Sequence, residues 1–349
     1  MKNFNISIIL SLLIVSLTFA QSSKSTFFKS VHVDTLLKDK ISIRAILISD
    51  GKVYYAGDQN RIGYIDLINK DKFERKINKD SIKMEFRSIA NNTTSIFVAT
   101  IGNPAFIYQF SKDLNLKKLV YEEHNDKVFY DCLQFWNDQE GIAIGDPISD
   151  CFSILITRNS GSTWTKVDCK NLPKMEDGEV AFSASNTNII IKGSKTWIVS
   201  GGKKARVFYS PDKGISWQVF NTPIIQGETM TGIFTADFYN DKIGIIAGGN
   251  YEKPNQNFKN KALTVDGGKT WKLIADNAEF GYASCIQFVP NSNEKQLVCV
   301  GANGLYYSKN RGKTWQQLLT DSTLYTIRFI NSTTAIAAGK NKIIKISFD

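Results

Sequence analysis

Short runs of alternating apolar and polar residues recur along the chain, and each leads into a turn and then into a more apolar run that ends in small residues. Residues 131–135 with 141–145 form one such pair, and residues 325–329 with 334–339 form another. Alternation with a period of two is typical of β-strands. Seven pairs begin 41 to 52 residues apart, a spacing that suits units of four short strands. The pairs begin at Arg44, Arg87, Asp131, Phe182, Phe234, Ser284 and Tyr325.

A second pattern, Ser/Thr-x-Asp/Asn-x-Gly-x-Ser/Thr-Trp, occurs four times at intervals of 53, 54 and 44 residues. The Asp or Asn can accept hydrogen bonds from its own turn, the Gly supplies a positive φ, and the Trp ring can pack under the turn. Apolar runs flank the copies, so each copy predicts the tip of a β-hairpin. The Asp/Asn, Gly and Trp positions are Asn159, Gly161, Trp164; Asp212, Gly214, Trp217; Asp266, Gly268, Trp271; and Asn310, Gly312, Trp315.

This motif resembles the Asp-box (BNR) repeat, which lies on the outer hairpins of β-propeller blades. Together, the two patterns predict an all-β fold, a single seven-bladed β-propeller with four-stranded antiparallel blades. No linker or shift in composition interrupts residues 21–349, so we expect one domain. The seventh blade runs out of chain at residues 343–348. We therefore expect the N-terminal residues 27–33 to supply the missing outer strand and close the ring.

The composition excludes several classes of protein. Hydrophobic residues make up 42% of the chain and the mean hydropathy is −0.19, which excludes a disordered or fibrous chain. Two histidines and five cysteines without a CxxC or HExxH motif predict no metal, and no nucleotide-binding glycine motif occurs, so we expect no cofactor. The net charge of +10 is spread without a dense basic run, which argues against a nucleic-acid partner.

Residues 1–20 have the pattern of a signal peptide. Lys2 precedes an apolar run over residues 6–19, and Thr18-Phe19-Ala20 suits cleavage before Gln21. The run is too short and too interrupted by polar residues for a membrane anchor. We therefore expect a periplasmic or secreted protein with no membrane span after cleavage.

An oxidising compartment permits disulfides. Cys151 and Cys169 flank one predicted turn, and Cys285 and Cys299 flank another, so each pair either bridges adjacent strands or remains as two buried thiols. Cys132 is left over in either case.

The chain as a whole resembles the photosystem II stability/assembly-factor-like propellers. The resemblance rests on the Asp boxes, the signal peptide, and the stretches Phe-Arg-Ser-Ile at 86–89, Gly-Asp-Pro at 145–147 and Ala-Arg-Val-Phe-Tyr-Ser at 205–210. It implies a non-enzymatic scaffold that binds other proteins, and it does not say which protein this chain binds.

Candidate binding residues follow from the repeat. Arg44 and Arg87 begin the innermost strands of neighbouring blades, so we expect both guanidiniums near one rim of the central channel, where planar donors suit carboxylates. The alternative is that they satisfy loop carbonyls. Arg206 begins a later strand and is a further candidate that can lie elsewhere. Tyr251 belongs to a long insert, residues 250–261, which is either a contact loop or a flexible surface loop.

Acidic residues near predicted strand ends could assemble a pair about 5–10 Å apart, as in glycoside hydrolases, or serve as caps of turns. Asp boxes are also found in sialidases, but the Arg-Ile-Pro signature of that group is absent, and Arg158 and Arg311 fall in outer hairpins. The acidic candidates are Asp131, Asp146, Glu179, Glu228 and Asp237.

We therefore predict an exported, non-catalytic scaffold whose partner is another protein of the cell envelope or exterior. We place Asp131 and Asp146 with Arg44, Arg87, Arg206 and Tyr251 as binding candidates, and we name no catalytic residue. A glycan ligand is the alternative partner, with a carbohydrate-binding or sialidase-like glycoside hydrolase propeller as the alternative function. We expect a monomer, because a closed ring leaves no strand edge to pair.

Overall fold

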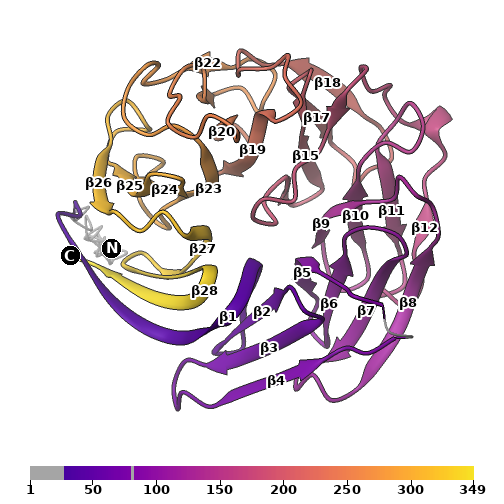
Figure 1. The fold of residues 1–349 in the computed structure, drawn as a ribbon. Coiled ribbons are helices and arrows are strands. Elements are labelled where there is room, and N and C mark those ends of the chain that lie inside the picture. Colours follow the sequence, from indigo (N-terminus) through magenta and orange to yellow (C-terminus); the bar gives the residue numbers. More distant parts are fainter. Residues whose placement is uncertain (1–26, 80–81) are drawn as a thin grey trace, which may run out of the picture.

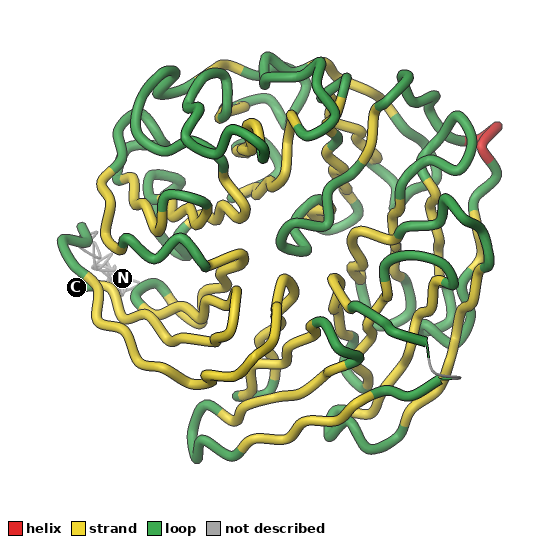
Figure 2. Tube along the Cα trace, viewed as in Figure 1, coloured by secondary structure: helices red, strands yellow, loops and turns green. Residues whose placement is uncertain are grey.

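The computed structural model describes residues 27–79 and 82–349, so the predicted signal peptide lies outside the described residues. The described chain forms a ring of β-strands around a central axis, with one short 3-10 helix, η1 (Cys169–Asn171), near the outer rim (Figure 1; Figure 2). The strands are β1 (Val31–Ser49), β2 (Lys52–Gly57), β3 (Arg61–Asp66), β4 (Lys72–Lys76), β5 (Phe86–Asn91), β6 (Ser95–Thr100), β7 (Ala105–Ser111), β8 (Lys117–Glu123), β9 (Tyr130–Phe135), β10 (Gly141–Gly145), β11 (Ser153–Thr157), β12 (Thr165–Lys166), β13 (Glu179–Val180), β14 (Ile189–Lys192), β15 (Lys195–Val199), β16 (Gly201–Gly202), β17 (Arg206–Ser210), β18 (Gln218–Asn221), β19 (Thr231–Phe238), β20 (Gly244–Asn250), β21 (Lys261–Thr264), β22 (Lys272–Leu273), β23 (Ala283–Phe288), β24 (Leu297–Gly301), β25 (Gly304–Ser308), β26 (Gln316–Leu319), β27 (Leu324–Asn331) and β28 (Thr334–Phe348).

These strands form six antiparallel sheets in the described part of the chain. Four sheets have four strands, in the orders β5-β6-β7-β8, β9-β10-β11-β12, β14-β15-β17-β18 and β23-β24-β25-β26. Two sheets have six strands, in the orders β13-β16-β19-β20-β21-β22 and β27-β28-β1-β2-β3-β4. The all-β class and the four-stranded antiparallel blades agree with expectation.

The predicted count of seven blades is wrong, because the described strands form six sheets. The strands expected to make separate first and seventh blades belong to one hydrogen-bonded sheet. The cause is β1, which is 19 residues long and pairs at both of its ends. Its residues 31–38 pair with β28, and its residues 43–49 pair with β2.

The N-terminal and C-terminal strands are thereby neighbours. Val31 lies opposite Phe348 in an antiparallel ladder, and Asp349 N donates to Ser30 O at 3.1 Å. The Phe28 ring lies 4.7 Å from the Phe348 ring and 4.8 Å from the Tyr307 ring. Apolar packing therefore reinforces the backbone pairing where the two ends meet.

The strand pair expected to begin at Phe182 does not begin there. Its inner strand, β14, starts at Ile189, and residues 181–188 form a loop that enters the middle of the ring (Figure 2). We call these residues the central loop. Asn186 Nδ2 donates to Ile89 O on β5 at 2.8 Å, and Ser185 Oγ donates to Ser284 O on β23 at 2.6 Å. Polar side chains let this segment lie in the buried centre, since Ser185 and Asn186 find partners on the surrounding strands.

Apolar side chains fill the space between adjacent sheets. Trp197 on β15 is fully buried, and its ring stacks at 4.0 Å on Phe238 of β19 in the next sheet. Sheets in this fold bury both faces against their neighbours, so the core is divided among the gaps between sheets.

Each of the four Asp boxes lies between the outermost strand of its sheet and the strand next to it. In the second copy, Gly214 N donates to Ser210 Oγ at 2.8 Å, and Ser216 N donates to Asp212 Oδ1 at 2.8 Å. Trp217 Nε1 donates to Gly214 O at 3.2 Å. The first two bonds recur in all four copies, and the Trp bond recurs in the third and fourth. The motif thus closes its own turn.

The first Asp box packs more tightly against the neighbouring sheet. Trp164 Nε1 has no hydrogen-bond partner among the described residues, and the indole instead lies edge-on to the Phe97 and Phe135 rings. Gly161 has φ +77°, and a Cβ there would lie 2.2 Å from the Phe97 ring. Only glycine satisfies both the turn and this close approach.

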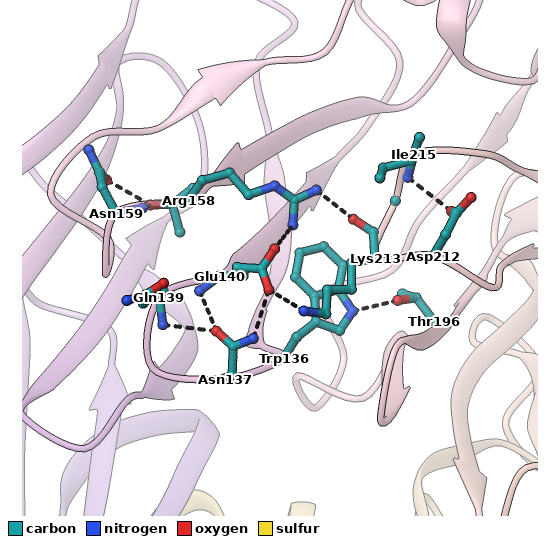
Figure 3. Close-up of polar contacts among 12 residues, drawn as sticks. Trp136, Asn137, Gln139, Glu140, Arg158, Asn159, Thr196, Asp212, Lys213 and Ile215 are labelled. Atoms are coloured by element: carbon teal, nitrogen blue, oxygen red, sulfur yellow. Dashed lines mark hydrogen bonds and ion pairs between the residues drawn. The ribbon is translucent and has the colours of Figure 1, made fainter.

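Charged side chains tie neighbouring Asp boxes together at the outer rim (Figure 3). Glu140 accepts hydrogen bonds from Arg158 Nη1 at 2.7 Å and from Lys213 Nζ, and Arg158 Nη2 donates to Lys213 O at 2.9 Å. Below them, Trp136 Nε1 donates to Thr196 Oγ1 at 2.7 Å. Arg158 therefore links two outer hairpins.

One of the two candidate cysteine pairs is a disulfide. Cys151 and Cys169 are bonded, with their Cα atoms 5.6 Å apart, whereas Cys132, Cys285 and Cys299 are free and buried. Cys285 lies opposite Val300 rather than opposite Cys299, so the two sulfurs project from opposite faces of the sheet.

Candidate functional site

A cavity of about 390 Å³ opens on the face of the ring where the inner strands begin. Its walls come from β1, β5, β9 and β19 together with residues 180–184 of β13 and the central loop. A second cavity of about 290 Å³ adjoins it, and the two share Arg44, Tyr251 and Tyr282. We call the first one the central cavity. Five of the six predicted binding residues line it: Arg44, Arg87, Asp131, Asp146 and Tyr251.

The two arginines lie side by side at the rim of the central cavity, and each contacts the central loop. Arg44 Nη1 donates to Ala184 O at 3.2 Å, and its guanidinium lies 4.2 Å from the centre of the Tyr325 ring. Arg87 Nη1 donates to Ser183 Oγ at 3.2 Å, and its Nε donates to Glu85 Oε1 at 2.6 Å. Arg44 thus satisfies a loop carbonyl and also lines the cavity, whereas Arg87 lines the cavity and donates to a side-chain hydroxyl.

Two aspartates lie in the wall of the same cavity. Asp131 is completely buried, and neither of its carboxyl oxygens makes a well-formed hydrogen bond among the described residues, although the backbone N–H of Ser183 lowers its pKa. Burial raises its pKa well above the ordinary value, and the neighbouring Asp146 raises it further. Burial also raises the pKa of Asp146 to about 6, although its Oδ1 accepts a hydrogen bond from Ala181 N at 2.9 Å.

Aromatic rings also line the central cavity. Phe182 and Phe234 stack at 3.9 Å with their planes 4° apart, and the Tyr282 ring meets Phe234 edge-on at 4.8 Å. Tyr251 is 45% exposed and meets Tyr282 edge-on at 5.2 Å. Phe182, Phe234 and Tyr282 were not among the predicted site residues. Phe182 and Phe234 are predicted starts of strand pairs, as Arg44 and Arg87 are, and that equivalence in the repeat is the signal that could have found them, although Phe182 lies in the central loop.

Arg206 lies outside the central cavity. Its guanidinium is held by Glu179, which is completely buried, with Nε–Oε1 at 3.0 Å and Nη2–Oε2 at 2.5 Å. Nη2 also donates to Lys174 O at 2.8 Å. This buried ion pair leaves neither group available to a ligand, and it removes both residues from the candidate site.

The remaining acidic candidates are also engaged elsewhere. Glu228 accepts from Asn250 Nδ2 at 2.9 Å and pairs with Lys253 at 3.3 Å. Asp237 accepts from the backbone N–H groups of Phe238 and Phe288, each at 2.8 Å, and burial raises its pKa. Of the five acidic candidates, only Asp131 and Asp146 line the central cavity.

The central loop separates the central cavity from the opposite face. There a cavity of about 330 Å³ is lined by the far ends of the inner strands and by Arg328. Arg328 Nη2 donates to Ser185 O at 2.9 Å and to Asn186 O at 3.2 Å. Its guanidinium therefore holds the central loop from the opposite side.

No cluster of three or more His, Cys, Asp or Glu side chains in residues 27–79 and 82–349 is arranged to hold a metal ion. That part of the chain also has no helix with the length and apolar character to cross a membrane.

Comparison with known proteins agrees with the ring of sheets. Residues 306–317 match the BNR/Asp-box repeat, and no curated protein matches the sequence. A structure described as YCF48 bound to D1 peptide superimposes with a TM-score of 0.65 at 12% identity, covering 93% of this chain and 98% of that one. YCF48 from Cyanidioschyzon merolae gives 0.64 at 12% identity, with 90% and 98% covered. The RRP9 WD40 repeats give 0.66 at 9% identity, with 93% and 100% covered. At these identities the likeness concerns the fold, and it identifies the chain as a β-propeller that carries an Asp-box repeat.

Proposed function

We propose that this chain is an exported, non-catalytic β-propeller that binds a segment of another protein in the central cavity. The observation that carries the proposal is the composition of that cavity. It combines two arginines, two aspartates and five aromatic side chains in a recess at the middle of a rigid ring. Recesses with apolar walls and a few convergent polar groups are the usual form of a binding site.

A likeness of fold supports a protein ligand. YCF48, whose solved structure holds a D1 peptide, has a ring of similar shape, which indicates that such a ring can accommodate an extended segment. The rim residue Tyr251 comes from a loop on a stable scaffold, which is where binding residues usually lie.

The disulfide supports export. Disulfides persist in oxidising compartments and are rare in the cytosol, so Cys151–Cys169 fits a periplasmic or secreted protein. The functional form would then be the single propeller of residues 21–349 that remains after signal cleavage.

Photo-crosslinking at the cavity rim tests the proposal in the organism's own envelope. We would replace Tyr251 with p-benzoylphenylalanine, and in a control chain Ile215, an exposed residue of an Asp box. We expect a defined protein adduct from position 251 and none from position 215. We also expect the Arg44→Ala/Arg87→Ala variant to lose the adduct, and Arg158→Ala/Arg311→Ala, which removes the same charge at the outer rim, to keep it. Adducts that form equally at both positions, or no adduct at position 251, would overturn the proposal.

A glycan-cleaving function is the second candidate, because two carboxyls and stacked aromatics do share one cavity. Incubation with a panel of methylumbelliferyl glycosides, sialosides included, separates the two. Turnover that disappears in Asp131→Asn would favour a glycosidase over the scaffold. We expect no turnover above that of the variant.

A further inference from the structure

The carboxyl group of Asp131, in the wall of the central cavity, is short of hydrogen-bond donors. Asp131 is completely buried, and neither of its carboxyl oxygens makes a well-formed hydrogen bond among the described residues. The backbone N–H of Ser183 acts on this carboxyl and lowers its pKa, which leaves most of its capacity as an acceptor unused. Buried acceptors without donors are rare in folded proteins and cost free energy. A buried carboxyl with unused acceptor capacity in the wall of a cavity therefore points to a ligand that brings the donors.

The nearby cations do not fill this role. Arg87 is near enough to Asp131 to lower its pKa, but the hydrogen bonds of Arg87 go to Glu85 and Ser183. Arg44 stacks on Tyr325 and donates to the central loop. A metal ion is a poor candidate, because the described residues offer no third acidic, His or Cys ligand beside the two aspartates.

A primary ammonium group matches the cavity. It carries three N–H donors on one atom, so it can serve several carboxyl oxygens at once. Phe182, Phe234 and Tyr282 also line this cavity, and because Phe182 and Phe234 stack face to face they offer it apolar surface. A methylene stem behind the ammonium would pack against the same rings.

We propose that the central cavity binds a primary ammonium group of its partner, with Asp131 and Asp146 as the acceptors and the aromatic wall around the adjoining methylenes. This inference rests on the proposed function, since it names the chemistry recognised by the same cavity. The ammonium belongs to a lysine side chain or to the first residue of a chain, and the two sources share this chemistry.

Proton release should accompany binding. The charged groups that face Asp131 are Asp146, on the segment after β10, and Arg87 on β5, with Arg44 in the same cavity wall. Burial and mutual repulsion raise the pKa of Asp131, and burial raises that of Asp146 to about 6. An entering cation favours the ionised carboxylates, so the affinity should rise between pH 5 and pH 8.

Calorimetric titration of the chain comprising residues 21–349 with short peptides tests this. One probe is a peptide blocked at both ends, acetyl-Ala-Leu-Lys-Leu-Ala-amide, and a second replaces its lysine with norleucine. A third carries norleucine and a free N-terminus. We expect at least about tenfold tighter binding of one or both amine-bearing peptides than of the blocked norleucine peptide, as for loss of a buried charge partner. Tighter binding of the lysine peptide would identify a lysine side chain as the source of the ammonium group, and tighter binding of the peptide with a free N-terminus would identify a chain terminus.

Single substitutions test whether the two aspartates are the groups that bind the amine. Asp131→Asn and Asp146→Asn should each weaken amine binding by about tenfold or more and flatten its pH dependence. Asp212→Asn, which changes an aspartate at the outer rim, should leave both unchanged. Equal affinity for the lysine, norleucine and free-amine peptides in the wild-type protein would overturn the inference without relying on any variant. Undiminished binding in a folded Asp131→Asn protein would overturn it as well.

The outcomes separate this inference from the proposed function. If the Tyr251 adduct forms and the amine peptides show no preference, protein binding stands and the ammonium assignment fails. If the amine peptides bind and no adduct forms, the ammonium site stands and the proposed protein partner fails.

Discussion

Asp131 and Asp146 are held in a setting that favours their neutral forms. Each would ionise readily in an unfolded chain at neutral pH, whereas in the folded protein burial opposes the charge. The two buried carboxyls in the wall of the central cavity therefore lower the free energy of unfolding at neutral pH. Residues that are costly in the free protein are common where a ligand is bound.

Replacing Asp146 with a residue that cannot ionise should change how the free energy of unfolding depends on pH. A raised acid pKa contributes stability that is fully present below the ordinary value of 3.8 and is lost as the pH rises through about 6. Asp146→Asn keeps an oxygen for Ala181 N and cannot ionise. We expect it to match the wild type at pH 4 and to be about 2–3 kcal/mol more stable at pH 8. Urea unfolding of both proteins at pH 4 and pH 8 measures their free energies of unfolding. A difference between variant and wild type that is the same at the two pH values would contradict the prediction.

The residues of the site were predictable where the repeat places them. Arg44 and Arg87 occupy equivalent positions of the strand pairs, and Asp131 begins a pair, so symmetry alone brings them to one end of the channel. Arg206 also begins a strand, yet β17 is the third strand of its sheet and lies away from the axis. Its pairing with Glu179 depends on a loop conformation that no local pattern records.

At the level of elements, the Asp box accommodates either Asp or Asn by reversing one hydrogen bond. Asp212 Oδ2 accepts from Ser216 Oγ at 2.6 Å, whereas Asn310 Nδ2 donates to Thr314 Oγ1 at 2.9 Å. A hydroxyl can be donor or acceptor, so both versions close the turn. This explains why the four copies carry two of each residue.

Substitutions at Asp212 should separate the turn's hydrogen bonds from its charge. Asp212→Ala removes the acceptor for Ser216 N, Ile215 N and two hydroxyls, and we expect a loss of about 1–2 kcal/mol. Asp212→Asn reproduces the first and fourth copies and should cost less than about 0.5 kcal/mol. Chemical denaturation of both variants tests this, and equal losses would show that charge, not turn closure, stabilises the motif.

One predicted element failed for a physical reason that lies beyond local patterns. Residues 182–185 alternate apolar and polar side chains as a strand would, but they form part of the central loop. Ser185 and Asn186 find their partners on β5, β23 and β27, far away in the sequence. Such long-range polar contacts override the local preference for a strand.

At the scale of the whole molecule, the long strand β1 explains why the count of sheets was wrong. The start predicted at 325 lies one residue from the observed start of β27 at Leu324, whereas residue 44 falls inside β1, which begins at Val31. The half of β1 that contains residue 44 pairs with β2, and its first half joins β28. The spacing of the repeats says nothing about whether β1 continues without a break from one pairing to the next. It does continue, and two predicted blades become one sheet.

Deleting the first half of β1 should destabilise the entire ring. A chain that begins at residue 39 loses the pairing of residues 31–38 with β28 and the packing of Phe28 on Phe348 and Tyr307. We expect a loss of more than about 4 kcal/mol and self-association through the exposed edge of β28. Light scattering and thermal unfolding would compare it with a chain that begins at residue 27. A monomer that melts within a few degrees of this control would contradict the expectation.

The meeting of β1 with β28 also sets how the ring responds to mechanical force. The two strands are antiparallel, and Ser30 and Asp349 lie together at one end of their ladder. Tension applied between these two residues loads the hydrogen bonds one after another, as in unzipping, and not all at once, as in shear. The seam that completes the ring is therefore the place where a pulling partner or an unfolding machine would open it with the least force.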